Sequence, residues 1–207
     1  GGERGPVLVC AVLYALAPYH FIRGETHLWL AAYYAVPVGA YLALAVIGGD
    51  DLIGSRRRLL VTGGLAALVA VASGSFYYSA FTIVLVAVAA LLRFAATRES
   101  RSLLPAVFVV GVLVALSLVQ LTPTIAYQAA NGRNEQVAKR FSHESEVYSL
   151  KLSQLVFPLD DYRIDAVGRI KRRYSAHFPP GDARAATLGI VATAGLAWLF
   201  FARLARR

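Results

Sequence analysis

Three long apolar runs without a single charged side chain constrain this chain more than any other feature of its sequence. The runs are Leu28–Ile47, Leu103–Leu121 and Ala185–Ala202, which contain 20, 19 and 18 residues. A helix needs about 20 apolar residues to cross the hydrocarbon core of a bilayer. Because only helices and closed barrels satisfy their backbone hydrogen bonds in lipid, the three runs predict transmembrane helices.

Composition and three shorter runs extend this prediction to an all-α, polytopic transmembrane bundle with no β-sheet. The chain is 57% hydrophobic and 16% charged, whereas soluble domains average about 25% charged residues. Leu59–Ala72 and Tyr77–Leu92 are interpreted as two spans joined by a turn, since one continuous helix would be too long for the bilayer. Val7–Ala17, which ends before Pro18, brings the total to about six hydrophobic segments.

The spacing of these segments predicts three regions along the chain. They are transmembrane helices with short loops over residues 1–121, a long extracytoplasmic loop over 122–184, and a terminal transmembrane helix with a basic cytoplasmic end over 185–207. Within the long loop we expect an amphipathic helix over Glu146–Phe157. Val147, Leu150 and Leu155 recur there at roughly helical spacing, and Pro158 ends the pattern.

The positive charge is distributed as membrane topology requires. The formal net charge is +9, and short arginine-rich stretches at residues 48–58, 93–101 and 203–207 fall on one side of the predicted crossings. Cytoplasmic loops carry such an excess of arginine and lysine. The 18 arginines against 3 lysines suggest a GC-rich bacterial genome. We therefore expect a bacterial inner (plasma) membrane protein whose basic residues serve topology, with no nucleic acid as partner.

Several familiar signals are missing from the sequence. It contains no methionine, which predicts a fragment of a longer polytopic protein, and it contains one cysteine, Cys10. A single cysteine cannot form an internal disulfide, and Cys10 is interpreted as a small buried hydrophobic residue. The chain has no P-loop, no G-x-G-x-x-G and no G-x-S-x-G motif, so nucleotide-binding and α/β-hydrolase templates are excluded.

The stretch PYHFIRGETHLWLAAYYAVP places His20, Arg23, Glu25 and His27 between two apolar runs. One interpretation is a solvated loop with an Arg23–Glu25 surface pair of little energetic value. The other is a site at the outer interface, in which Arg23 binds phosphate and a carboxylate or imidazole acts as a base. His20 and His27 are seven residues apart and no H-E-x-x-H motif is present, so no metal site is predicted.

A second polar cluster lies in the long loop, within NGRNEQVAKRFSHESEVYSLKLSQ. Arg140, His143 and Lys151 are its candidate substrate-binding residues. One interpretation is a solvated amphipathic helix that rests on the membrane with its cations extended toward water. The alternative is a lid over the outer site, whose basic side chains grip the diphosphate of a lipid-linked donor.

Three motifs carry a family resemblance over about Ala17–Arg173. PYHFIRGETHLWLAAYYAVP, SGSFYYSAF and EVYSLKLSQLVFP resemble stretches of large bacterial membrane proteins in or near the GT-C glycosyltransferase superfamily, including its YfhO-type members. The resemblance implies that a sugar is transferred from a polyprenyl-phosphate donor on the outer face, with the bilayer and that donor as partners. The resemblance is compatible with a divalent metal cofactor but does not require one.

The resemblance also bears on the catalytic base. The superfamily's catalytic carboxylate lies in the first outer loop, and Glu25 occupies the first outer loop visible here, so Glu25 is the candidate catalytic residue. RGETH is not an acidic pair, and the base is therefore expected upstream of this sequence. This chain would then supply the donor-phosphate and lid region of the enzyme.

Two other functions compete with the glycosyltransferase. A transporter or flippase for a lipid or polysaccharide would place ionisable residues inside its spans, and Leu28–Ile47, Tyr77–Leu92 and Leu103–Leu121 contain none. A non-catalytic membrane subunit is opposed only by the two polar outer loops. We therefore expect part of a glycosyltransferase and keep the other two functions as alternatives.

Overall fold

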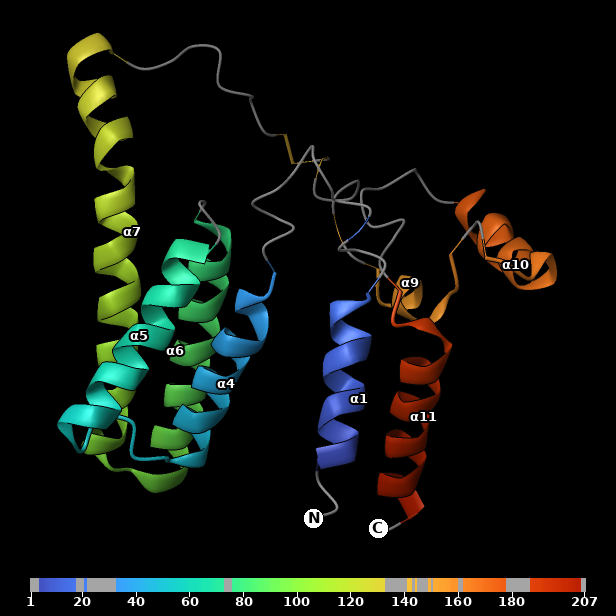
Figure 1. Cartoon of the computed structure of the whole chain (residues 1–207), viewed down its shortest axis with the longest axis horizontal. Helices are drawn as coiled ribbons and strands as arrows, with labels where there is room; N and C mark the ends of the chain where they lie inside the picture. The colour runs from blue at the N-terminus through green and yellow to red at the C-terminus, as the bar shows by residue number, and fades with distance from the viewer. Residues whose placement is uncertain are drawn as a thin grey trace. The chain divides into compact units, whose positions relative to one another are not determined.

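Every regular element in the described part of the chain is a helix (Figure 1), which confirms the all-α fold class. The chain divides into two compact units, one formed by Gly1–Gly24 with Val137–Arg207 and the other by Glu25–Gln136. Each unit is treated by itself below. The computed structural model describes residues 4–17, 21, 33–72, 76–132, 141–142, 144, 149, 151–159, 162–177 and 187–205.

The unit Glu25–Gln136 contains a bundle of apolar helices. Its described elements are α4 (Ala35–Gly48), α5 (Arg56–Ala72), α6 (Tyr77–Thr97), the short 3-10 helix η2 (Ser100–Leu103) and α7 (Leu104–Asn131). Helix α4 packs against α6 and α5, and α7 packs against α5 and α6. Side chains with no exposed surface mark the centre of the bundle, among them Leu42, Val69, Val86, Val109 and Leu113.

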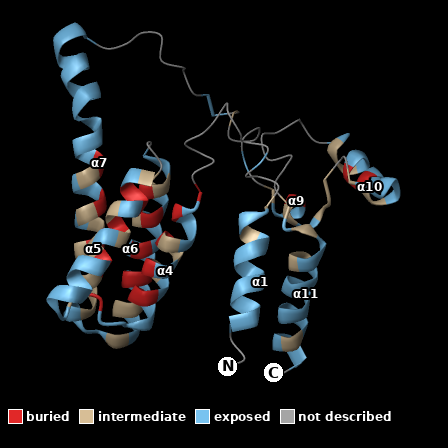
Figure 2. Cartoon of the chain, viewed as in Figure 1, coloured by how far each residue is buried: buried red, intermediate tan, exposed pale blue. Residues whose placement is uncertain are grey.

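Buried residues lie where the helices of this bundle face one another, and exposed residues cover its outside (Figure 2). The buried side chains are mostly small, whereas many of the exposed ones are large and apolar. Helix α4 lies close to α6 at Gly39, where an added Cβ would meet both the Oγ1 and the Cγ2 of Thr82, the latter at 3.2 Å. Ser79, also on α6, is buried as well. The outward-facing large residues include Leu44, Leu60, Val71, Phe81, Val84, Leu91, Val107 and Val119.

Two described helical stretches are long and apolar enough to cross a membrane, Tyr77–Thr97 and Ser100–Asn131. Only 22% of the residues in the most apolar part of each are buried. The helices Arg4–Ala15, Ala35–Gly48 and Gly189–Ala205 are apolar but shorter. The described residues therefore support two spans by length and composition, and the six-segment topology remains a prediction.

All charged side chains in the described part of this unit lie at one end of the bundle. They occupy the α4–α5 connection with the start of α5, and the end of α6 with the loop to α7 (Figure 1). Six arginines stand there against three carboxylates. The residues of this charged end are Asp50, Asp51, Arg56, Arg57, Arg58, Arg93, Arg98, Glu99 and Arg101.

The predicted helix starts and ends differ from the structure in four places of this bundle. The run Leu28–Ile47 was expected to be helical throughout, but α4 begins at Ala35 after a turn at Tyr33 and Tyr34. Pro37 fits this start, because a proline in the first turn of a helix lacks only an N–H that would have no intrahelical partner there. Residues 28–32 lie outside the described part.

Helix α5 begins earlier than predicted, at Arg56 instead of Leu59. Ser55 is the reason, because its Oγ accepts the backbone N–H of Arg58 at 3.3 Å and so caps the first turn. Helix α6 likewise continues past Leu92 to Thr97. Arginines that were assigned to connecting loops therefore begin or end helices.

Helix α7 extends past residue 122, where the boundary between the transmembrane helices and the long loop was expected. The long loop was predicted to start at Thr122, but the helix continues to Asn131 and ends at Gly132, whose φ is 79°. Pro123 lies inside the helix, and Thr122 donates its hydroxyl to the carbonyl of Leu118 at 3.1 Å within the helix. Residues 122–131 therefore continue α7 as an exposed helix.

The other unit contains α1 (Arg4–Ala15), α9 (Leu152–Val156), α10 (Asp165–Ser175) and α11 (Gly189–Ala205). Neither α1 nor α11 has a buried residue. Cys10 lies exposed on α1, which corrects the expectation that it is buried. The backbone N–H of Leu188 donates to the carbonyl of Leu155 at 2.9 Å, which joins the start of α11 to α9.

The amphipathic helix predicted over Glu146–Phe157 is wrong as a single element. Ser149 is not helical, and Lys151 has an extended backbone with φ −84° and ψ 128°, so only Leu152–Val156 forms a helix. The extended residue at position 151 interrupts the helical hydrogen-bond series. The strongly amphipathic helix in the described part of this region is α10.

Helix α10 is held against the end of α9 through Tyr174. The Tyr174 hydroxyl lies 2.5 Å from Ser153 Oγ, and its ring lies 4.6 Å from the ring of Phe157. Asp165 in the first turn pairs with Arg169 and Arg172 on the exposed face. Ile170, on another side of the helix, is 52% exposed, so α10 presents both basic and apolar side chains to its surroundings.

Candidate functional site

Most of the residues predicted to form the outer site lie outside the described part of the chain. They are His20, Arg23, Glu25, His27, Arg140 and His143. Lys151 is described: its backbone N–H donates to Gln154 Oε1 at 3.1 Å, and its carbonyl accepts the Gln154 N–H at 2.8 Å. Lys151 thus begins α9, and its predicted role in substrate binding stays a prediction.

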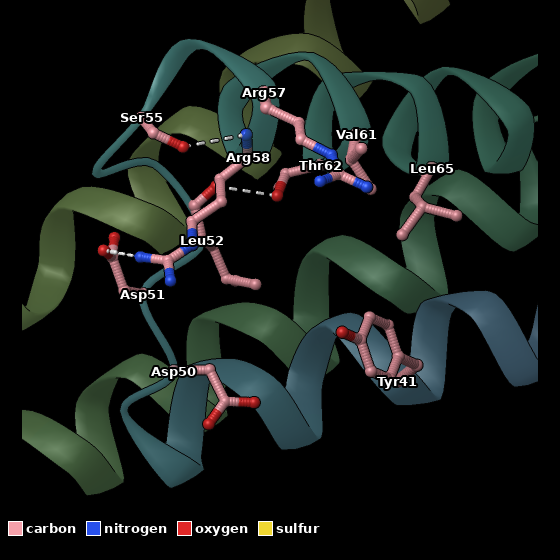
Figure 3. Close-up of a pocket in the computed structure, with 10 residues that line it drawn as sticks. All are labelled: Tyr41, Asp50, Asp51, Leu52, Ser55, Arg57, Arg58, Val61, Thr62 and Leu65. Carbon is pink, nitrogen blue, oxygen red and sulfur yellow. Dashed lines mark hydrogen bonds and ion pairs between the residues drawn. The ribbon is translucent and has the colours of Figure 1, made fainter.

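A cavity of about 600 Å³ lies between α4 and the first turns of α5, at the charged end of the bundle (Figure 3). One part of its lining is charged and polar, and the other part is apolar. We call it the charged-end cavity. Its lining residues are Tyr41, Asp50, Asp51, Leu52, Ser55, Arg57, Arg58, Val61, Thr62 and Leu65.

The end of α4 sets the position of the acidic wall. Gly49 has a left-handed backbone with φ 78°, which glycine adopts without the steric cost of a Cβ. Its N–H donates to the carbonyl of Val46 at 3.1 Å, and the N–H of Asp50 donates to that of Ala45 at 2.9 Å. This is the double hydrogen bond of a Schellman motif, and it turns Asp50 directly into the lining of the cavity.

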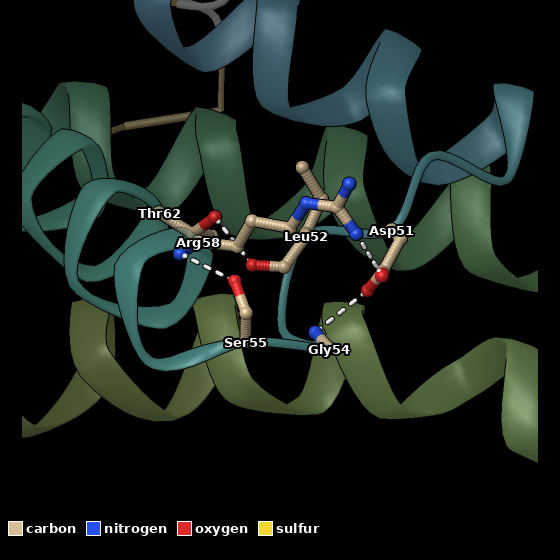
Figure 4. Close-up of polar contacts among 6 residues, drawn as sticks. All are labelled: Asp51, Leu52, Gly54, Ser55, Arg58 and Thr62. Atoms are coloured by element: carbon tan, nitrogen blue, oxygen red, sulfur yellow. Dashed lines mark hydrogen bonds and ion pairs between the residues drawn. The ribbon is translucent and has the colours of Figure 1, made fainter.

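Asp51 organises the loop that follows (Figure 4). One of its carboxylate oxygens accepts the N–H of Gly54 at 2.6 Å, and the other pairs with the guanidinium of Arg58. Both side chains of the pair are about half exposed, so the pair contributes little to stability. Its structural effect is to orient Arg58 back over the loop.

A buried hydrogen bond closes the inner wall of the cavity. Thr62, which is only 3% exposed, donates its hydroxyl to the carbonyl of Leu52 at 2.8 Å (Figure 4). The bond ties the loop to the second turn of α5 and satisfies a carbonyl that the loop would otherwise leave buried and unpaired. This hydrogen bond therefore fixes the inner wall, or floor, of the cavity between the loop and α5.

Two charges of opposite sign remain available in the lining. Among the residues that the structure describes, neither an ion pair nor a side-chain hydrogen bond holds Asp50 or Arg57. Figure 3 shows Asp50 at the end of α4 and Arg57 on α5, on opposite sides of the cavity. Tyr41, Val61 and Leu65 extend the lining away from these charges, so the cavity combines both charge signs with an apolar wall.

Sequence reasoning treated these residues only as markers of topology. GGDDLIGSRRR was read as an arginine loop, and its two carboxylates received no role. The acidic pair Asp50–Asp51, which lies five residues before the arginines, could have indicated that carboxylates and arginines pair within this loop. Which of the charges stay unpaired could not be read from it, because that depends on the Asp51–Arg58 contact.

The described residues form no metal site, and no relative is found for the chain. In the described ranges, no three His, Cys, Asp or Glu side chains lie close enough together to hold a metal ion. Comparisons with protein-family models, with curated proteins and with solved structures return no match. The GT-C resemblance therefore rests on the three sequence motifs.

Proposed function

We propose that this chain is an integral membrane protein of the bacterial inner membrane, with its charged end in the cytoplasm. The segregation of charge carries the proposal: in the described bundle every charged side chain lies at one end, and large apolar side chains cover the outside. Helices that associate in lipid pack through small residues and direct large apolar ones outward. A soluble bundle would show the opposite distribution.

The arginine excess at the charged end supports its cytoplasmic orientation, because short cytoplasmic loops are enriched in arginine and lysine. Residues Arg56, Arg57 and Arg58 belong to one connection, and Arg98 and Arg101 to the next. In the proposed topology α5 and α6 both cross the membrane, so the two connections face the same compartment. The far end of α7 then faces the outside of the cell.

Within this membrane protein we further propose the transfer of a sugar from a polyprenyl-phosphate donor on the outer face. The GT-C resemblance supports this activity, as does the mixture of Arg23, Glu25 and two histidines beside an apolar run. In this proposal Arg23 binds the donor phosphate through a bidentate contact. Glu25 acts as a base for the acceptor hydroxyl.

The described helices weaken the transporter alternative. Polar groups along a transport path are expected inside the spans, yet between Arg58 and Arg93 the described part contains no charged residue. Gln120 is exposed, and its side chain donates to the carbonyl of Ala70 at 3.0 Å, which is a contact between α7 and α5. Such a contact stabilises packing and does not line a path.

The natural protein, assayed in membranes with a radiolabelled polyprenyl-phosphate sugar, tests the proposed activity. Since a charge-assisted hydrogen bond is worth about 1.5–3 kcal/mol, Arg23→Ala should lower donor use about tenfold to a hundredfold. Arg23→Lys should restore part of it, because lysine lacks the bidentate fork. Arg101→Gln, on the face that the proposed topology places in the cytoplasm, is the matched control. Unchanged donor use in Arg23→Ala would contradict the assignment and favour a non-catalytic membrane subunit.

A further inference from the structure

We propose that the charged-end cavity binds a phospholipid with a zwitterionic head group, whose phosphate contacts Arg57 and whose primary ammonium contacts Asp50. In the proposed orientation the charged end faces the cytoplasm, whereas the sugar transfer is proposed for the outer face. The lipid site depends on the membrane location and not on the enzymatic activity. A lipid is the occupant that matches the position, the charges and the apolar wall together.

The charges of the cavity select the head group. Asp51 and Arg58 neutralise each other, which leaves one carboxylate, Asp50, and one guanidinium, Arg57, on opposite sides (Figure 3). Guanidinium and phosphate form strong charge-assisted hydrogen bonds, and so do ammonium and carboxylate. An anionic head group would satisfy Arg57 but would face the carboxylate of Asp50.

The ammonium group must carry N–H donors to fit Asp50. A primary ammonium offers three donors to a carboxylate, whereas a trimethylammonium offers none. Both groups carry the same charge, so the difference between them isolates hydrogen bonding from charge. Phosphatidylethanolamine is therefore expected to bind better than phosphatidylcholine.

The apolar part of the lining accommodates the rest of the lipid. Tyr41 and Val61 are 51% and 55% exposed, and with Leu65 they continue from the charged residues along α4 and α5. In a bilayer this places the charges at head-group level and the apolar wall beside the first part of an acyl chain. The cavity volume of about 600 Å³ is within the usual range of small-molecule sites, about 300–1,000 Å³.

Competition among three lipids tests the proposal. The chain in detergent micelles would be mixed with equal amounts of phosphatidylethanolamine, phosphatidylcholine and phosphatidylglycerol of the same acyl chains, and retained lipid would be counted by native mass spectrometry. We expect phosphatidylethanolamine to be retained about tenfold over each of the others, as one charge-assisted contact allows. Equal retention of the three lipids would overturn the proposal.

Two variants and two controls separate the cavity from the general charge of this end. Arg57→Gln should reduce phosphatidylethanolamine retention about tenfold. Asp50→Asn should remove the preference for it over phosphatidylglycerol. Glu99→Gln and Arg101→Gln change the same charges at the same end but outside the cavity lining, and both should leave retention unchanged. If the two control variants reduced lipid retention as much as the cavity variants, the lipid would be attracted to the charged end as a whole. That result would contradict a specific site in the cavity.

Discussion

The guanidinium of Arg93 donates a hydrogen bond of 3.3 Å from Nη1 to the carbonyl oxygen of Gly48. Arg93 belongs to α6 and Gly48 ends α4, so one side chain joins the two helices at the charged end of the bundle. The same guanidinium occupies the space beside Gly49, where an added Cβ would lie 2.5 Å from Arg93 Cζ. The position of Arg93 therefore depends on a residue without a Cβ in the turn after α4.

Gly49→Ala is expected to destabilise the protein. Alanine at φ 78° costs about 1–2 kcal/mol, and its Cβ would displace Arg93 from the Gly48 carbonyl. The free energy of unfolding, measured by denaturing-detergent titration in mixed micelles, should fall by that amount. Gly64→Ala is the control, because it is the same change in a helix with nothing within 4 Å of the added carbon. Equal losses in the two variants would contradict this account of the turn.

Gly39→Ala is expected to push α4 away from α6. Thr82, which is 4% exposed, cannot yield without moving its own helix, and overpacking of this kind costs about 1–3 kcal/mol. Thr82→Ala in the same chain should recover much of the loss by removing the opposing atoms. Unfolding titrations of the two single variants and the double variant measure this coupling. Strictly additive losses would indicate that Gly39 and Thr82 do not oppose each other.

Thr62→Val tests the buried hydrogen bond on the floor of the cavity. Valine keeps the volume but leaves the Leu52 carbonyl without its donor, at an expected cost of about 1–3 kcal/mol in unfolding free energy. Thr122→Val is the matched control, because Thr122 is exposed and bonds only within its own helix. That control should change stability by less than about 0.5 kcal/mol. A control variant as unstable as Thr62→Val would mean that the hydroxyl of Thr62 is unimportant.

Accessibility labelling tests the orientation of the bundle. In a Cys10→Ala background, Ser55→Cys and Ser100→Cys each place one thiol at the charged end, and Gln128→Cys places one near the far end of α7. An impermeant maleimide should modify the first two variants in inverted membrane vesicles and the third in right-side-out vesicles. Modification of the Ser55 and Gln128 variants from the same side would exclude a bundle that crosses the membrane.

The centres of the helices could be predicted from sequence, whereas their ends could not. Long charge-free runs mark α6 and α7 because a run of apolar residues leaves few alternatives. The ends depend on single contacts, such as the Ser55 hydroxyl that draws Arg56, Arg57 and Arg58 into α5. Contacts of this kind are decided by geometry, and residue type alone does not reveal them.

The charged-end cavity lay beyond sequence reasoning for the same reason. Its character follows from which carboxylate pairs with which arginine, and the turn at Gly54 brings Asp51 to Arg58 and leaves Asp50 available. The amphipathic element of the long loop was misplaced because one extended residue, Lys151, interrupts an otherwise helical pattern. Both outcomes depend on local backbone angles.

The length of α7 sets a distance for whatever follows it. Its 28 residues measure about 42 Å at 1.5 Å per residue, against about 30 Å for the hydrocarbon core. Standing upright in a bilayer, the helix would overhang on the side away from the arginines by about two turns. The segment after Gly132 would then start at a fixed distance above the acyl chains, level with the head groups or beyond them.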